Sequence, residues 1–206
     1  MVVVVGYFLG SIPTGFLFAR ARGIDIRAVG SGNIGATNAF RVLGRPLGAT
    51  VLVVDVLKGI LAGAAVPALA QALAGAVPVN GDALKVVGGI AAVLGHNYTC
   101  WLNFSGGKGV ATTGGVLLAW VPGGFLLTLA AWLIVFSVSR YVSLASLAAA
   151  CTLAPAVALT GGSTLMTVVA GMLGVLGIFK HRSNIQRLLN GTEPRVGRGT
   201  TPTKKS

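Results

Sequence analysis

Long apolar runs separated by short polar breaks dominate the sequence. The runs cover about residues 1–19, 47–74, 83–94, 109–138, 142–159 and 164–179. Most of them approach or exceed the roughly 20 residues that an α-helix needs to cross the hydrocarbon core of a membrane. The pattern predicts an all-α polytopic membrane protein.

The run 109–138 forms either one long helix or two short ones, because Pro122-Gly123-Gly124 interrupts it. With two helices there are seven spans, the N-terminus lies outside and the C-terminus is cytosolic. Every basic residue except Lys58 and Lys85 then falls in an inner segment, as the positive-inside rule requires. With one helix, the basic C-terminal segment would lie outside. We therefore predict about seven transmembrane helices, of which the fourth, at about 12 residues, is short for a core of roughly 30 Å.

The first apolar run has no basic residue ahead of it, and its positive charges, Arg20 and Arg22, follow it. This order disfavours a cleaved signal peptide and favours a first span that begins outside the cell.

Composition agrees with the membrane assignment. The 206 residues are 54% hydrophobic and 10% charged, and the mean hydropathy is +0.83, unlike an ordinary soluble domain. We expect one domain over residues 1–206, with residues 195–206 as a flexible polar tail. The net charge of +12 does not indicate a nucleic-acid partner, because the basic residues lie between and after the apolar runs. Cys100 and Cys151 have no metal-ligand spacing and are expected to be reduced.

Three polar segments fall on the same inner side in this topology. The first, residues 30–44, reads GSGNIGATNAFRVLG. Ser31-Gly32-Asn33 predicts a flexible turn, and a short helix ended by Gly44 and Pro46 should follow. Asn38, Arg41 and Arg45 recur at i, i+3 and i+7 and would share one helix face. An ordinary capped helix with a solvated basic face would give the same pattern.

The second segment, residues 95–115, reads GHNYTCWLNFSGGKGVATTGG. Its glycines around Lys108 allow the positive φ angles that a backbone anion nest needs, and a helix beginning at Val110 would add its positive N-terminal end. The turn is not a Walker P-loop, because Gly109 follows the lysine. Alone it could equally be a loop between membrane helices.

The third segment, residues 180–193, reads KHRSNIQRLLNGTE. His181, Asn184 and Leu188 share a helix face, and Gly191 should end the helix. An amphipathic helix with arginines on anionic membrane lipid would also explain this segment.

Together the three segments predict a cationic pocket at the inner membrane surface. They supply Ser31, Arg41, Lys108 and His181, whereas the only carboxylates of the chain are Asp25, Asp55, Asp82 and Glu193. Such a pocket suits a phosphate-bearing substrate with an acyl chain, and it lacks the clustered carboxylates of a divalent-metal site. Asp55 and Lys58, at i and i+3 inside an apolar run, form either a structural ion pair or a buttress of the pocket.

The segments SGNIGATNAFRVLG, GHNYTCWLNFSGGKGVATTGG and HRSNIQRLLNGTE strongly resemble the three signature motifs of the bacterial acyl-phosphate:glycerol-3-phosphate acyltransferases, the PlsY family. Their order, their spacing and the length of the chain also resemble that family, as does DVLKG at residues 55–59.

The resemblance implies a seven-helix enzyme of the bacterial cell (inner, or plasma) membrane with its active site on the cytosolic side. It implies transfer of a fatty acyl group from acyl phosphate to the 1-hydroxyl of sn-glycerol 3-phosphate. The products would be lysophosphatidic acid and phosphate, the first acylation of phospholipid synthesis. It also implies that no metal or other cofactor is needed, and that acyl-CoA and acyl carrier protein are not direct donors. An enzyme that produces acyl phosphate is then an expected partner.

The resemblance and the pocket hypothesis together define the expected site. Ser31, Arg41, Lys108, His181 and Asn184 are expected to be catalytic. The expected substrate-binding residues are Gly32, Asn33, Asn38, Arg45, His96, Gly106, Gly107 and Lys108. Asp55, Lys58 and Glu193 are expected to support the site structurally.

Two questions stay open at this point. Either His181 or the acyl phosphate itself accepts the proton of the attacking hydroxyl, since no carboxylate in the motifs would orient the imidazole. The pocket would also suit a transporter of organic phosphate, although transporters place charged sites near the midplane of the membrane. A metal-dependent alcohol transferase is disfavoured, because the acidic cluster that it needs is missing.

Overall fold

The computed structural model describes residues 1–75, 77 and 80–197, and this part of the chain is helical with no strand. The longer elements are α1 (Val2–Ser11), α4 (Arg45–Ile60), α5 (Val66–Ala74), α6 (Gly81–Asn97), α7 (Val110–Trp120), α8 (Pro122–Ser139), α9 (Val142–Leu159) and α10 (Thr164–Lys180). The shorter elements are α2 (Thr14–Arg20), α3 (Ala36–Leu43), the π-turn η1 (Leu61–Ala65), the 3-10 turn η2 (Cys100–Leu102) and α11 (Arg182–Leu189). The all-α prediction is confirmed.

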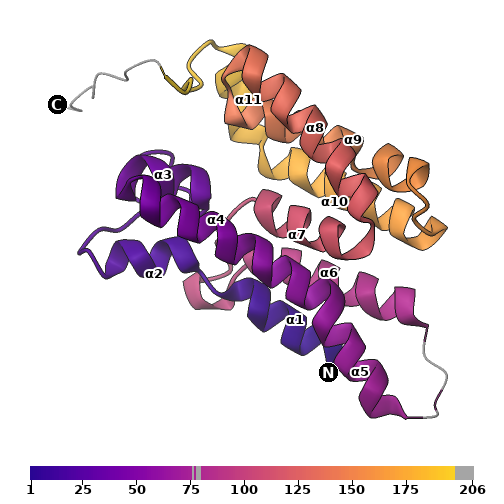
Figure 1. Ribbon diagram of the computed structural model, residues 1–206. Helices are drawn as coiled ribbons and strands as arrows, with labels where there is room; N and C mark the ends of the chain where they lie inside the picture. The colour runs from indigo at the N-terminus through magenta and orange to yellow at the C-terminus, as the bar shows by residue number, and fades with distance from the viewer. Residues whose placement is uncertain (76, 78–79, 198–206) are drawn as a thin grey trace.

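The helices form two groups with α7 between them (Figure 1). In one group α9 packs against both α8 and α10, and in the other α1 packs against α6. The central helix α7 contacts α4, α6, α8 and α10. The main core accordingly joins α6, α7, α9 and α10 through buried residues such as Val93, Val116 and Val157.

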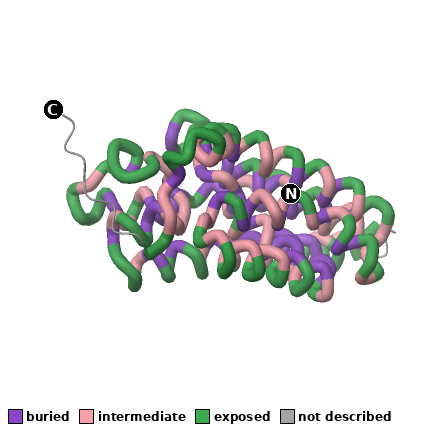
Figure 2. Tube along the Cα trace, turned by 90° about the horizontal axis from the view of Figure 1, so that it is seen from above, coloured by how far each residue is buried: buried purple, intermediate pink, exposed green. Residues whose placement is uncertain are grey.

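Figure 2 shows that exposed residues recur along the outer faces of the helices, and many of these residues are large and apolar. On α8, Leu126, Ile134 and Val138 are 62, 64 and 80% exposed. Apolar residues this numerous on the outer face of one helix are typical of a surface in contact with lipid, so these faces fit an integral membrane protein.

Glycines let α4 and α7 pack with their backbones in contact. A Cβ added at Gly59 of α4 would overlap the carbonyl of Thr112, and one added at Gly115 of α7 would overlap the carbonyl of Val56. Small residues give close packing between helices in lipid, as the abundance of glycine predicts. This contact holds α7, which Lys108 precedes, against α4.

The run 109–138 divides at Val121 into α7 and α8, as predicted, and α7 has only 11 residues. By length and apolar composition, four helical segments of the described residues could cross a membrane: Val2–Arg20, Arg45–Ala74, Pro122–Ser139 and Val142–Leu159. A fifth is added if α10 and α11, bent by 56°, count as one broken span. Seven crossings and the outside N-terminus therefore stay predictions.

The predicted end of the first polar segment's helix at Gly44 is confirmed, but the predicted place of Arg45 on that helix is wrong. The helix of the first polar segment ends at Leu43, because Gly44 takes a φ of 86°, and Arg45 begins α4 with Pro46 in its first turn. Arg45 therefore does not share a helix face with Asn38 and Arg41. Of the predicted tail, residues 195–197 are described and residues 198–206 lie outside the described part, as do residues 78 and 79 of a predicted interhelical turn.

Candidate active site

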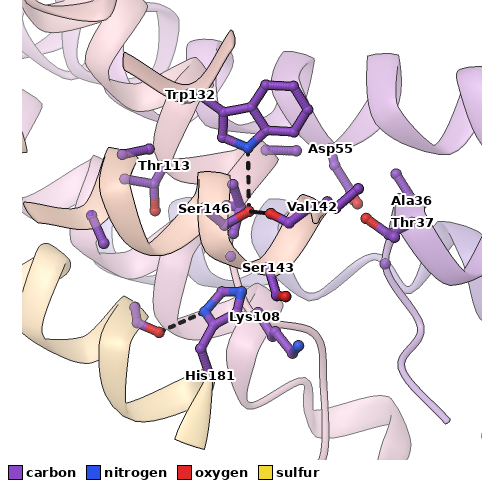
Figure 3. A pocket seen from close by; sticks show the side chains of 18 of the residues that line it. Ala36, Thr37, Asp55, Lys108, Thr113, Trp132, Val142, Ser143, Ser146 and His181 are labelled. Carbon is purple, nitrogen blue, oxygen red and sulfur yellow. Dashed lines mark hydrogen bonds between the residues drawn. The ribbon is translucent and has the colours of Figure 1, made fainter. Parts of the chain in front are cut away.

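A cavity of about 440 Å³ lies where both helix groups and α7 meet (Figure 3). One end is polar and is lined by residues that include Ser31, Arg41, Lys108, His181 and Asn184. The other end is apolar and is lined by residues that include Leu117, Phe125, Leu129, Leu153 and Leu173. The cavity therefore suits one ligand, or a pair of ligands, with anionic and apolar parts.

The three polar segments meet at this cavity although they are far apart in the sequence. The predicted site residues that line it are Ser31, Asn33, Asn38, Arg41, Asp55, His96, Lys108, His181, Asn184 and Glu193. Those that do not line it are Gly32, Arg45, Lys58, Gly106 and Gly107.

Asn38 holds the loop that carries Ser31. Its Oδ1 accepts a hydrogen bond from the Ser31 N–H at 2.9 Å, and its amide nitrogen donates to the carbonyls of Ile26 and Val29 at 3.2 and 3.1 Å. Asn38 is only 1% exposed, and both of its N–H groups are used. The structure thus gives Asn38 a loop-holding role where the sequence predicts substrate binding.

The first segment is completed by Asn33 and Arg41. The Asn33 Oδ1 accepts from the Gly35 N–H at 2.8 Å and shapes the turn that precedes α3. Arg41, in the last turn of α3, lines the polar end of the cavity. Partial burial lowers the pKa of Arg41 from its usual value, while the nearby Glu193 opposes this shift.

Gly106 and Gly107 are not arranged as an anion nest. The Gly106 N–H donates to the Asn97 carbonyl at 3.1 Å, and the Gly107 N–H donates to the His96 carbonyl at 2.9 Å. A Cβ added at Gly107 would also overlap the imidazole of His96. Here the glycines allow close approach to the end of α6, and the prediction that their N–H groups cradle a phosphate is corrected.

The part of the turn that does face the cavity is its last part. Gly109, at a φ of 78°, starts α7, and the first helical residues Val110 and Ala111 line the cavity together with Lys108. The first N–H groups of a helix are free of intrahelical partners and carry partial positive charge. The start of α7 therefore adds to the positive potential of the polar end.

Lys108 belongs to a chain of hydrogen bonds that runs into the third segment. Its Nζ donates to Asn184 Oδ1, and Asn184 Nδ2 donates to Glu193 Oε1 at 2.7 Å. Arg187 Nε donates to the other oxygen of Glu193 at 2.7 Å. Burial lowers the pKa of Lys108 to about 8, and the cations Arg187, Arg41 and Lys180 contribute to the shift.

His181 is held in one orientation by the helix that precedes it. Its Nδ1 lies 2.8 Å from the carbonyl oxygen of Gly177, so Nδ1 carries the proton and Nε2 has a free lone pair. Burial and the nearby Lys108 charge lower the pKa of His181 to about 4. The imidazole is thus neutral at physiological pH, and a backbone carbonyl one helical turn back supplies the orienting group for which the sequence shows no carboxylate.

Asp55, Lys58 and His96 form a buried triad between α4 and α6. Lys58 Nζ lies 2.8 Å from Asp55 Oδ1, 2.8 Å from His96 Nδ1 and 3.3 Å from the carbonyl oxygen of Ile12. These three partners match the three N–H groups of the ammonium. Asp55 and His96 line the cavity and Lys58 does not, so the Asp55–Lys58 ion pair lies directly behind the cavity wall, and its supporting role stays a prediction.

Several lining residues have no signal in the sequence, because they lie inside apolar runs. Trp132 of α8 donates from Nε1 to the Ser146 hydroxyl at 3.3 Å, and Ser146 donates to the carbonyl of Val142 at 2.8 Å (Figure 3). Ser143, one turn earlier on α9, also lines the cavity and points toward Lys108 and His181 (Figure 3). Within residues 1–75, 77 and 80–197 there is no group of three His, Cys, Asp or Glu side chains that could hold a metal ion.

Known proteins share this sequence and fold along nearly the whole chain. The sequence profile of the family described as glycerol-3-phosphate acyltransferase matches residues 1–191. Glycerol-3-phosphate acyltransferases from Sinorhizobium medicae and Geobacillus kaustophilus are 46 and 45% identical over 95% of this chain and over 91 and 95% of their own lengths.

A solved structure extends the similarity to three dimensions. The crystal structure of PlsY, an integral membrane glycerol 3-phosphate acyltransferase, in its glycerol 3-phosphate form is 40% identical to this chain. It superposes with a TM-score of 0.85 over 95% of this chain and 94% of its own. A second form, with lysophosphatidic acid, gives a TM-score of 0.82 at 39% identity. The family profile, the relatives and the superposed fold agree that the chain belongs to the glycerol-3-phosphate acyltransferase family.

Proposed function

We propose that this protein transfers a fatty acyl group from acyl phosphate to the 1-hydroxyl of sn-glycerol 3-phosphate. The products are lysophosphatidic acid and inorganic phosphate, so the reaction is the first acylation of phospholipid synthesis. The observation that carries the proposal is one cavity with an apolar end and a cationic end, the latter built from the three segments that resemble the family's motifs.

Two anionic substrates must bind side by side, and the cations of the polar end offset their repulsion. Within the described residues Lys108 Nζ donates to Asn184, which leaves two of its three N–H groups to meet the phosphate of glycerol 3-phosphate. Arg41 lines the same end and can hold the acyl phosphate through two parallel hydrogen bonds. The start of α7 and the Ser31 hydroxyl supply further donors.

The acyl chain occupies the apolar end, between α7, α8, α9 and α10. An acyl chain bound there places the carbonyl carbon of the acyl phosphate where the apolar end of the cavity meets the polar end. Positioning both reactants supplies much of the rate enhancement, because a bimolecular step becomes effectively unimolecular.

In the chemical step the 1-hydroxyl oxygen attacks the carbonyl carbon of the acyl phosphate. The new C–O bond replaces the bond from that carbon to the bridging phosphate oxygen, and phosphate leaves with the electron pair. Donors around the carbonyl oxygen stabilise the oxyanion that develops, an effect typically worth about 3–4 kcal/mol for each donor.

The proton of the hydroxyl goes to an oxygen of the departing phosphate in the proposed mechanism. His181, with a pKa of about 4, is a weak proton acceptor at neutral pH, although its Nε2 can accept a hydrogen bond and orient the hydroxyl. His181 as the general base is the alternative, and the pH profile described in the Discussion separates the two.

The site lies on the cytosolic side of the bacterial cell membrane in this proposal. Support comes from the positive-inside rule, because the polar end is lined by Arg41 and Lys108 and Arg187 pairs with the lining residue Glu193. The substrates then enter from the cytosol and from the membrane, and an enzyme that produces acyl phosphate is the expected partner. No cofactor is required.

Purified protein in detergent tests the proposal directly. Glycerol 3-phosphate is offered with either palmitoyl phosphate or palmitoyl-CoA, and lysophosphatidic acid and phosphate are measured. We expect equal amounts of both products with palmitoyl phosphate and none with palmitoyl-CoA. Product formation from palmitoyl-CoA alone would overturn the assigned donor, and uptake of glycerol 3-phosphate into proteoliposomes without acyl phosphate would favour a transporter.

A further inference from the structure

The geometry points to Arg195 as a positioning residue, which fastens the segment after α11 to the α8–α9 turn and thereby holds Glu193 against Asn184. The inference rests on the proposed function for its kinetic consequence and on the contacts below for its structural one. The family profile ends at residue 191, so Arg195 lies beyond the part of the chain that the profile matches.

Two hydrogen bonds and a cation–π contact make this fastening, which we call the C-terminal clasp. Arg195 Nε donates to the Ser139 carbonyl at 3.2 Å, and the Val196 N–H donates to the Arg140 carbonyl at 3.0 Å. The Arg195 guanidinium lies 5.0 Å from the centre of the Tyr141 ring. In Figure 1 the segment after α11 (yellow) runs past the same end of α8.

The α8–α9 turn is suited to receive these donors. α8 ends at Ser139, and Arg140 follows in the left-handed conformation, at a φ of 62°. The last carbonyls of a helix have no intrahelical partner and carry partial negative charge. Ser139 and Arg140 offer two such carbonyls, so a cationic donor and a backbone N–H are favourable partners for them.

Glu193 depends on such a fastening, because it lies outside any helix. α11 has eight residues, and Gly191, at a φ of 67°, turns the chain away after it. Locally, the N–H groups of Thr192 and Glu193 donate to the Arg187 carbonyl at 2.8 and 3.1 Å. These two bonds tie Glu193 to α11, whereas the clasp ties the segment that carries Glu193 to the α8–α9 turn.

Two further hydrogen bonds connect the segment held by the clasp to the polar end of the cavity. Glu193, 8% exposed, accepts from Asn184, and Asn184 accepts from Lys108. The α8–α9 turn also leads directly into Val142 and Ser143, which line the cavity. The clasp therefore joins the two walls that flank Lys108, and its loss should weaken glycerol 3-phosphate binding more than it slows the chemical step.

The full-length protein with Arg195→Gln tests the clasp, and Arg195→Lys is the conservative variant. Arg182→Gln is the matched control. Like Arg195, Arg182 makes a cation–π contact, 4.8 Å from the Phe179 ring, and does not line the cavity. We expect Arg195→Gln to raise KM for glycerol 3-phosphate about tenfold with kcat within about twofold, since one charge-assisted hydrogen bond is lost. Arg195→Lys should recover most of the affinity, and Arg182→Gln should leave both constants unchanged.

Hydrogen–deuterium exchange of the same variants supplies a readout that does not depend on acyl transfer. Arg195→Gln should speed exchange at residues 184–193 and at 139–143, whereas Arg182→Gln should not. Unchanged exchange in Arg195→Gln, or unchanged KM in an active protein, would overturn the inference. A wild-type protein without acyl transfer would instead overturn the proposed function, and exchange would still decide whether the clasp exists.

Discussion

Lys108, on the loop before α7, donates a hydrogen bond to Asn184 on α11, which lies 76 residues later in the sequence. This contact joins the second polar segment to the third, and Glu193 extends it at 2.7 Å from Asn184. Because Glu193 neutralises part of the local positive charge, it offsets the repulsion between Lys108 and Arg41 at the polar end of the cavity. The N–H groups of Lys108 that do not point to Asn184 can then donate to the phosphate of a substrate.

Activity should fall at alkaline pH as Lys108 loses its proton. Its pKa of about 8 means that the ammonium is charged below that pH and neutral above it. We expect kcat/KM for glycerol 3-phosphate to fall up to tenfold for each unit above about pH 8. Measurement between about pH 6.5 and 9.5 checks this, with Lys108→Arg as the variant that stays charged throughout.

Deprotonation of Lys108 should raise stability while it lowers activity, so measuring both against pH distinguishes loss of function from unfolding. A lowered pKa means that the folded protein releases this proton more easily than the unfolded chain, so Lys108 favours the folded state increasingly from about pH 8 upward. Loss of activity together with unfolding in that range would contradict the assignment to Lys108. So would an equal alkaline decline in Lys108→Arg.

His181→Ala should lower the rate without changing the shape of the pH profile near neutrality. With a pKa of about 4, His181 is neutral in the wild type from about pH 5.5 to 7.5, so its removal deletes a hydrogen-bond acceptor and not a titration. We expect a loss of about tenfold or more in kcat/KM. A wild-type limb near pH 6.5 that disappears in His181→Ala would instead identify His181 as the general base.

Breaking the buried pair of Asp55 and Lys58 should destabilise the protein strongly. The side chains are 4% exposed, and Lys58→Met leaves the carboxylate of Asp55 without its ammonium partner at 2.8 Å. The expected loss is about 3–5 kcal/mol, and the double variant Asp55→Leu/Lys58→Met should recover much of it. Thermal unfolding in detergent measures the stability of both variants. A double variant no more stable than Lys58→Met would show that the unpaired charge of Asp55 does not cause the destabilisation.

Gly107→Ala should disturb the turn because its new Cβ would overlap the His96 ring, which Lys58 holds in place. We expect a loss of about 1–3 kcal/mol in stability and a matching loss of activity as Lys108 is displaced. Gly171→Ala is the control, since its Cβ would lie 3.6 Å from Ala154, an ordinary contact. Equal melting temperatures for the two variants would contradict the close-approach role.

Leu129→Trp should shorten the acyl chains that the protein accepts. Leu129 lines the apolar end of the cavity from α8 and is 36% exposed, so a larger ring can be accommodated toward the cavity. Leu126→Trp is matched to it, because Leu126 lies on the same helix, is 62% exposed and does not line the cavity. The ratio of kcat/KM for palmitoyl phosphate to that for decanoyl phosphate should fall about tenfold only in Leu129→Trp, as expected for a few lost methylene contacts. An unchanged ratio would place the acyl chain elsewhere.

The arrangement of helices follows closely from the sequence, for reasons that are local. Apolar runs of sufficient length must form helices in lipid, because every backbone polar group needs an internal partner there. The break at residues 121–124 and the ion pair of Asp55 and Lys58 follow from spacing along the chain. The family resemblance rests on the same three segments.

The sequence could not show which hydrogen-bond partner or neighbouring group each polar residue and glycine of the site would contact. Glycines at residues 106 and 107 are compatible with a phosphate nest and with close approach to a neighbour, and only the position of His96 decides between them. Asn38 could face a substrate or its own loop, and the carbonyls of Ile26 and Val29 decide that it faces the loop. The sequence likewise gives no sign that Gly177 orients His181, or that Arg195 reaches the end of α8.

The sequence by itself therefore determined the helices, the family and the residues from which the site is drawn, because apolar length, charge position and short motifs are properties of local stretches. Only the tertiary structure decided which of those residues face the cavity and which hold it in shape. The physical reason is that a polar group has several chemically equivalent partners in the chain, and the packing of distant helices selects one.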